Sequence, residues 1–218
     1  MATSTQKTVK ILIAQNDLKT LKDAKYKLCF AKKVNDIFNV IWQSSDEYLH
    51  SNVFSWTPEY QLFGTNQFKA SVSVDVTTNV VDIKLGEQST LDAEGNLGQA
   101  STNSSAPTTI TLVNNYGDIH PGLNARSIGI TGEEQITPIY VAEDLMVSGS
   151  DTLTPIDEVM VWFEQNVETS CMFSDARSKS ETIDLTNNNE ETRVYQGGSW
   201  SIPSAREVEA FARLASKV

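Results

Sequence analysis

The chain has 218 residues, of which 39% are apolar and 8% aromatic; this excludes a disordered polar protein and is enough for one domain with a sizeable core. Its formal net charge is −11 and its pI is about 4.6, so a phosphate backbone would repel the molecule as a whole. We therefore expect no nucleic-acid binding, and binding to a membrane surface is disfavoured for the same reason.

The N-terminus and the cysteines bear on the cellular compartment. The short apolar run from Val9 to Ala14 is interrupted by Lys10, and it is shorter than the apolar core of a secretory signal. No apolar run is long enough to span a membrane as a helix. Cys29 and Cys171 stand beside apolar residues, which indicates buried free thiols rather than a disulfide framework. We therefore expect a cytoplasmic protein.

The first part of the chain predicts one strand and one aromatic hairpin. Residues 8–14 alternate between apolar and mixed positions, as a strand does, and residues 16–24 follow as a charged connector. Residues 25–42 predict a β-hairpin with a turn at residues 34–36, where Asn and Asp tolerate a left-handed backbone. The aromatic face of this hairpin needs a large cover, so we expect the rest of the chain to be arranged around it.

The cover is predicted to come from the aromatic segment that follows the hairpin. Seven of the 18 aromatic residues lie between Trp42 and Phe68. Within this segment, Pro58 is expected to end any regular strand, because proline cannot donate a ladder hydrogen bond.

The clearest alternation in the chain lies at residues 69–91. Val72, Val74 and Val76 alternate with Ser, Asp and Thr, and a similar pattern resumes after residue 79. It predicts an amphipathic hairpin with a polar outer face. Such a hairpin is typical of the surface of a β-sandwich, and also of pore-forming proteins that insert a hairpin into a membrane. Residues 92–107 are rich in Gly, Ser and Asn and predict a long flexible loop.

Later segments complete the predicted architecture. Residues 157–167 contain the run from Val159 to Phe163, which is apolar on both faces and indicates a central strand buried between two layers. Residues 181–185 and 192–195 are expected to form a last hairpin, and Ser204 with Glu207 forms a capping box that begins a helix. Further short strands are expected at residues 108–114, 136–141 and 145–147. The chain is thus predicted to be mainly β: a single domain over residues 1–218, built as an antiparallel β-sandwich with a short C-terminal helix at about residues 204–216.

The inventory of catalytic residues is small. Neither His50 nor His120 lies in a motif for a nucleophile, a zinc ion or a phosphate loop. A Cys-His pair that meets only in space stays open, but structural thiols are far more common than catalytic ones. We therefore expect a protein that is not an enzyme.

Asp118 and His120 are the best candidates for binding a metal. On an extended backbone their side chains project to the same side, where a carboxylate and an imidazole could provide two ligands. The alternative, which is favoured, is a surface turn in which Asp118 caps backbone N–H groups and His120 lies in water. Whether the chain binds a metal is left open.

Four aromatic residues are candidates for ligand binding, although each has a competing role in the core. Trp56 and Tyr60 flank Pro58 in an expected loop, Trp42 precedes them, and Trp200 follows two glycines. Flat rings with polar tips can wall a pocket for a planar molecule or a sugar ring. We therefore expect a non-enzymatic binding protein that holds a small planar aromatic ligand or pigment, non-covalently, against these four rings. A carbohydrate-binding lectin is the nearest alternative, and self-association into a homo-oligomer is left open.

In composition, the whole chain resembles soluble fruit-body proteins of fungi, a group that includes pigment-binding chromoproteins, cytosolic lectins and pore-forming defence proteins. The shared features are the acidic pI, the mass of 24.1 kDa, the absence of a signal sequence and a β pattern rich in Thr, Ser and Asn. The resemblance implies a binding protein rather than an enzyme, and it assigns no role to any residue.

Overall fold

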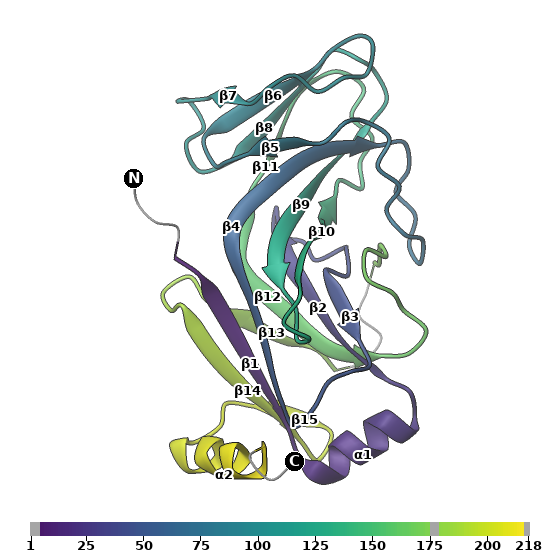
Figure 1. Cartoon of the computed structure of the whole chain (residues 1–218). Helices are drawn as coiled ribbons and strands as arrows, with labels where there is room; N and C mark the ends of the chain where they lie inside the picture. The colour runs from purple at the N-terminus through teal and green to yellow at the C-terminus, as the bar shows by residue number, and fades with distance from the viewer. Residues whose placement is uncertain (1–4, 175–178, 216–218) are drawn as a thin grey trace.

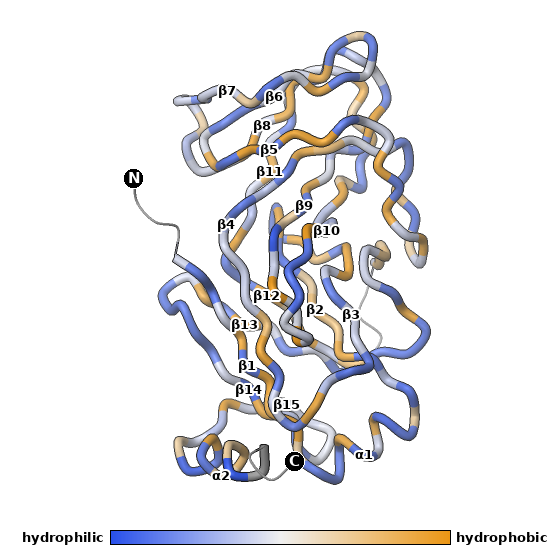
Figure 2. Tube along the Cα trace, in the orientation of Figure 1, coloured by the Kyte–Doolittle hydropathy of each residue, from blue (hydrophilic) through white to orange (hydrophobic). Residues whose placement is uncertain are grey.

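The structure is a computed structural model, and it describes residues 5–174 and 179–215. The protein is 50% strand, arranged in three open sheets, and a short helix lies near its C-terminus (Figure 1). The predicted mainly β fold with a C-terminal helix is therefore confirmed. Apolar residues follow the strands, whereas the connecting loops are mostly hydrophilic (Figure 2).

The first sheet has seven strands and contains both the first and the last strand of the chain. The N-terminal strand lies inside this sheet rather than at its edge, between the fourth strand and the fourteenth. In order across the sheet, the strands are β10 (Glu134–Val141), β9 (His120–Ile128), β4 (Ser51–Thr65), β1 (Lys7–Ile13), β14 (Glu190–Gln196) and β15 (Ser199–Ser201), with β5 (Val81–Ile83) also paired to β4.

The second sheet faces the first across an aromatic core. Its strands, in order, are β13 (Glu181–Asp184), β12 (Pro155–Glu164), β2 (Lys27–Val34) and β3 (Gln43–Ser45). Phe30 of β2 stacks on Phe54 of β4 with ring centroids 4.5 Å apart, and Trp42 meets Phe54 edge-on at 4.8 Å. The aromatic residues after this strand therefore cover the inner face of β2, as predicted, and β12 is the central buried strand expected at residues 157–167. The returning strand expected up to residue 42 is wrong, because the returning chain forms a ladder with β2 only at β3.

The third sheet is small and lies at the top of the molecule in Figure 1. Its strands, in order, are β11 (Gly149–Leu153), β8 (Ile110–Asn114), β6 (Glu87–Leu91) and β7 (Ser101–Thr102). Strand β7 falls within the predicted loop at residues 92–107. Most strand pairs of the described chain are antiparallel, but β1 with β14 and β6 with β8 are parallel. The two parallel pairs were not predicted.

The chain forms two helices, of which one was predicted. Helix α1 (Gln15–Asp23) replaces the expected charged connector at residues 16–24; only Leu18 and Leu21 turn inward, so its apolar stripe is too thin to be recognised in the sequence. Helix α2 (Ala205–Ala215) begins with the predicted capping box: Ser204 Oγ and Glu207 Oε2 are 2.7 Å apart, and Glu207 N donates to Ser204 Oγ at 3.3 Å. Ser216, the predicted last residue of this helix, lies outside the described residues. Neither helix, over the described residues, is long and apolar enough to cross a membrane.

The predicted hairpin at residues 69–91 is wrong. Residues 69–80, which we call the valine segment, begin with a turn that has a positive φ at Ser71 (65°) and form a single bridge in place of a strand. Val72, Val74 and Val76 are half-buried against a cluster that includes Phe63 and Met172. Their backbone bonds run to residues 170–172, for example from Met172 N to Val72 O at 2.9 Å, and not to the second half of the expected hairpin. Alternation in a sequence predicts which side chains pack against an apolar surface. It does not predict which other segment of the chain pairs with the alternating one.

Four other predictions concern turns, strand ends and pairing. The turn at residues 34–36 is confirmed, with positive φ at Asn35 (49°) and Asp36 (63°). Strand β4 continues through Pro58, contrary to expectation, because the chain absorbs the proline in a register shift between Trp56 and Tyr60 against β9. The expected last hairpin is wrong, since β13 and β14 belong to different sheets. The strand expected at residues 145–147 reduces to a single bridge.

Candidate functional site

A cavity of about 730 Å³ lies on the outer side of the first sheet, where β4, β5, β9 and β10 approach the chain entering β7. Cavities that bind small molecules are typically about 300–1,000 Å³ in volume. We call this one the Tyr60 cavity. Its lining residues are Glu59, Tyr60, Gln61, Val81, Asp82, Ile83, Lys84, Glu87, Gln99, Ala100, Arg126 and Ile136.

Strand pairing connects the polar groups of this cavity. Gln61 of β4 lies opposite Asp82 of β5 and opposite Asn124 of β9, so the three side chains share one face of the sheet. Gln61 Nε2 donates to Asp82 Oδ1 at 2.9 Å, and Asn124 Nδ2 donates to Gln61 Oε1 at 3.3 Å. Asn124 is only 7% exposed, and its Oδ1 has no hydrogen-bond partner among the described residues. A buried acceptor of this kind costs free energy unless a water or a ligand donates to it.

Arg126 is held in place at the edge of the cavity by two carboxylates. Its Nε lies 2.7 Å from Glu59 Oε2, as an ion pair in which the N–H does not point at the oxygen, and its Nη1 contacts Glu134. The backbone N–H of Lys84 donates to Glu87 Oε2 at 2.8 Å. The lining contains three carboxylates and two cationic side chains, so it favours neutral or positively charged ligands over anions.

The structure places the four predicted aromatic residues in three different environments. Trp42 and Trp56 are packed in the core, with ring centroids 5.5 Å apart. Tyr60 is the only one of the four in the cavity lining, and burial raises the pKa of its phenol, with a further contribution from the charge of Asp157. Trp200 lies elsewhere and stacks on Phe163 with ring centroids 5.6 Å apart. Trp56 and Tyr60 both lie on strand β4, but only Tyr60 lines this cavity, and Trp200 takes no part in it.

The polar lining was missed by the sequence analysis. Gln61, Asp82 and Arg126 were not singled out, although Asp82 occupies a polar position in a segment with strand-like alternation. A polar residue on a strand normally faces solvent, so its presence alone gives no signal. The signal that would have found this site is the pairing of β4 with β5, and that pairing cannot be read from either segment.

Asp118 and His120 lie in different environments, and the expectation that His120 lies in water is wrong. Asp118 is exposed, whereas His120 is buried, and its Nδ1 lies 2.8 Å from the backbone oxygen of Ala142. His50 Nδ1 similarly lies 3.0 Å from a backbone oxygen, that of Ile13. Within residues 5–174 and 179–215, no group of three or more His, Cys, Asp or Glu side chains is placed to hold a metal ion.

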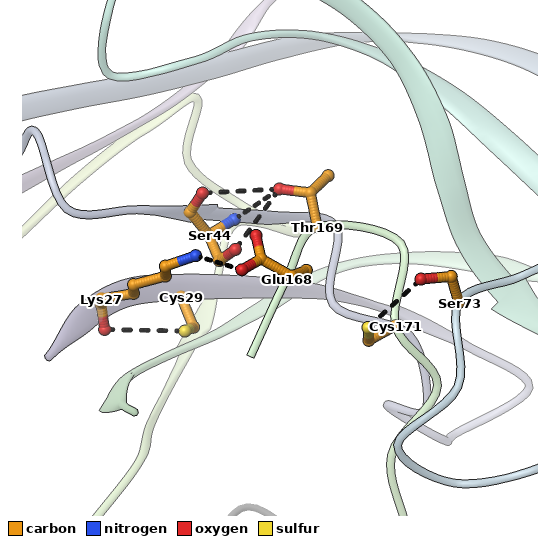
Figure 3. A network of polar contacts seen from close by, with 7 residues as sticks. All are labelled: Lys27, Cys29, Ser44, Ser73, Glu168, Thr169 and Cys171. Atoms are coloured by element: carbon orange, nitrogen blue, oxygen red, sulfur yellow. Dashed lines mark hydrogen bonds and ion pairs between the residues drawn. The ribbon is translucent and has the colours of Figure 1, made fainter. Parts of the chain in front are cut away.

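Both cysteines are free thiols on neighbouring segments (Figure 3). Cys29 is buried on β2, and burial raises the pKa of its thiol, so the unreactive protonated form is retained. Cys171 is half-buried, with Sγ 3.6 Å from Ser73 Oγ, on a loop that an ion pair between Lys27 and Glu168 holds against β2. Cys29 contacts a backbone carbonyl and Cys171 a hydroxyl, so the hydrogen bonds described for the two thiols do not involve histidine.

A scan against protein-family models and searches among curated proteins and solved structures find no match to this chain.

Proposed function

We propose that the chain is a binding protein without catalytic turnover, and that the Tyr60 cavity holds a small, neutral, hydroxyl-bearing ligand of the size of a mono- or disaccharide. The observation that carries the proposal is the hydrogen-bonded pair of Gln61 and Asp82 in the cavity lining, to which Asn124 is joined from the next strand. Amide and carboxylate groups that share one face of a sheet can donate to and accept from adjacent hydroxyls of one ring. Ile136, which pairs with Arg126 in the same lining, adds an apolar contact to that ring.

A glycan array followed by titration calorimetry tests this proposal. We expect wild-type protein to bind a subset of glycans, and Asp82→Ala to weaken binding about tenfold or more, because a hydrogen bond to a charged group contributes about 1.5–3 kcal/mol. Asp118→Ala is the matched control, since it removes an exposed carboxylate outside the cavity. An array without signal, or equal affinity in wild type and Asp82→Ala, would refute the proposal.

A planar aromatic ligand is the second candidate. It is favoured by the apolar part of the lining, namely Tyr60, Val81, Ile83, Ala100 and Ile136. Such a ligand would contact Tyr60 but not Trp42 or Trp56, whose rings are not in the lining. Native mass spectrometry and an absorption spectrum of the protein as purified distinguish the two candidates. Excess mass with absorption beyond that of Trp and Tyr would support the aromatic ligand. A mass equal to that of the polypeptide alone would refute it.

The pore-forming alternative depended on a hairpin at residues 69–91. The structure does not contain this hairpin, because β5 pairs with β4 while β6 pairs with β7 and β8. We do not propose it.

A further inference from the structure

Lys32 is a buried charged residue that lies outside the lining of the Tyr60 cavity. Its side chain is fully buried (0% exposed), with Nζ 5.2 Å from the ring centroid of Trp56. Lysine is rarely buried, because its ammonium group loses its hydration. This burial lowers the pKa of Lys32 to about 8, although the nearby Asp157 opposes the shift. The neutral amine, which is the nucleophilic form of lysine, is therefore accessible close to neutral pH.

Asp157 lies on β12, next to β2, and its carboxylate is placed between two lysines. Regular pairing of the two strands is interrupted between residues 155 and 159, and Asp157 lies in this interruption. Its Oδ1 is 3.6 Å from Lys32 Nζ, and its Oδ2 is 3.4 Å from Lys7 Nζ. Lys32 also donates to the backbone oxygen of Ile156 at 2.8 Å, and Lys7 donates to that of Leu185 at 2.7 Å. The side-chain amines of Lys32 and Lys7 thus both lie within ion-pair distance of the Asp157 carboxylate.

We propose that Lys32 and Asp157 react with each other and form an intramolecular amide bond, an isopeptide crosslink between β2 and β12. Lys32 Nζ is the nucleophile and Asp157 Cγ is the electrophile. Lys7 stabilises the negative charge that develops on Asp157 Oδ2 in the tetrahedral intermediate. Groups that a fold holds in a reactive orientation can reach effective concentrations of about 10⁵ M or more, which is how an otherwise slow condensation becomes feasible.

The reaction is a condensation and needs no oxidant and no other reagent. The Lys32 ammonium first passes a proton to Asp157 Oδ1, and the burial of Lys32 favours this transfer because it leaves the amine neutral. The amine nitrogen then attacks Cγ, the N–C bond forms, and the bond from Cγ to Oδ1 breaks. Oδ1 leaves as water, carrying a second proton from the nitrogen. The side chain of Asp157 is 37% exposed, so this water has a path to solvent.

The mass of the intact, denatured protein tests the proposal directly. We expect wild-type protein to weigh one water less than its sequence, and tryptic digestion to yield a branched peptide that joins the segments of Lys32 and Asp157. Lys32→Arg and Asp157→Ala should each restore the full sequence mass. Asp157→Asn should lose ammonia instead of water and reach the same linked mass as wild type, because the amide product is identical. Lys7→Met should leave a larger unlinked fraction in freshly purified protein.

Lys33 and Glu158 provide a matched control on the same two strands. Their Nζ and Oε2 atoms lie 3.0 Å apart, closer than the proposed pair, but the side chains are 19% and 23% exposed. The hydrogen bond to Glu158 raises the pKa of Lys33, so its amine stays charged and unreactive. We expect no branched peptide from this pair.

Two results would overturn the proposal. The first is wild-type protein with its full sequence mass and an unbranched tryptic peptide at Lys32, which would show that the two groups form an ion pair only. The second is a water deficit that persists in Asp157→Ala. The wild-type measurement is decisive even if a variant fails to fold.

Discussion

Arg193 links the two facing sheets through a single guanidinium group. It lies on β14 of the first sheet and is 7% exposed. Its Nε donates to Glu181 of β13, in the second sheet, at 3.0 Å, and its Nη1 donates to Glu191 at 2.9 Å. Removing one partner of a buried ion pair leaves the other charges uncompensated, so this residue contributes more to stability than a surface arginine.

We expect Arg193→Met to lower the free energy of unfolding by about 2 kcal/mol. This loss is smaller than that for a fully buried ion pair, because the two glutamates are partly exposed. Urea denaturation measures it. Arg126→Met, which breaks ion pairs at a more exposed arginine, should cost about 1 kcal/mol or less. Equal losses in the two variants would contradict the role assigned to Arg193.

The ion pair between Arg193 and Glu191 also predicts that the stability of the protein depends on pH. The hydrogen bond from Arg193 holds the pKa of Glu191 below its ordinary value of 4.5. A lowered carboxyl pKa contributes stability that is present above the unfolded value and is lost as the pH falls through the folded value. The difference in stability between wild type and Arg193→Met should therefore be largest above about pH 5 and shrink under more acidic conditions. A difference that stays constant down to pH 3 would show that the charge pair is not its source.

Gly122 is required by a close approach of Phe63. A Cβ added at residue 122 would lie 2.3 Å from two atoms of the Phe63 ring, and that ring is fully buried. We expect Gly122→Ala to cost about 2 kcal/mol or more, because a packed ring cannot move aside without strain. Thermal unfolding of Gly129→Ala is the comparison: its nearest neighbour is the flexible amide of Gln43, so we expect a smaller loss.

At the scale of elements, the capping box of α2 is the feature that the sequence predicts most fully. Only Val208 and Phe211 are described as packing against Leu12 and Val194, so the first turn depends strongly on its cap. Ser204→Ala should therefore increase hydrogen exchange of the amides at residues 206–208. Hydrogen bonds from Ser204 lower the pKa of Glu207, so the cap is formed above about pH 4.5 and weakens as the pH falls below it.

Glu209→Gln is the control for the cap. Glu209 forms an ion pair with Arg213 at 4.0 Å on the exposed face of the same helix. Loss of this pair should leave the exchange of the first turn unchanged, since surface pairs within a helix contribute little. If Glu209→Gln and Ser204→Ala increase exchange equally, the helix is held by its overall charge pattern rather than by its cap.

The elements also show what sequence can and cannot predict. Strand β1, the turn at Asn35 and Asp36, strand β12 and the cap of α2 depend on neighbours within a few residues, and all four were predicted. The valine segment and strand β13 were predicted as extended chain, but their partners were wrong, because a partner is set by contacts far away in sequence. The polar lining of the Tyr60 cavity could not be predicted for the same reason, since Gln61 and Asp82 become neighbours only when β4 pairs with β5.

At the scale of the whole molecule, the fold is closed by its two ends. Residues 8–13 of β1 pair with residues 190–195 of β14 in parallel, so the ladder joins segments that are separated by most of the chain. β1 is also paired on its other side to β4, and its inward residues Val9, Ile11 and Ile13 are fully buried. The largest sheet therefore cannot be completed without the C-terminal strands.

Deletion of residues 190–218 should abolish cooperative unfolding in urea, because it exposes one edge of β1 and removes Arg193 from between the sheets. Deletion of residues 204–218 should leave a cooperative transition at lower urea concentration, since it uncovers only the patch around Leu12 and Val194. A fragment of residues 1–189 that unfolds cooperatively would refute the idea that the ends close the fold.

The central position of β1 has a consequence for protein synthesis. The ribosome makes β1 well before its neighbour β14, and at about 5–20 residues per second roughly 10–40 s pass between the two. Throughout this interval the nascent chain carries an apolar strand with an open edge. We therefore expect the largest sheet to be completed only after β14 has emerged from the ribosome, and a stalled nascent chain that ends before β14 to be held by chaperones, as pulldown of ribosome-bound chains of increasing length can show.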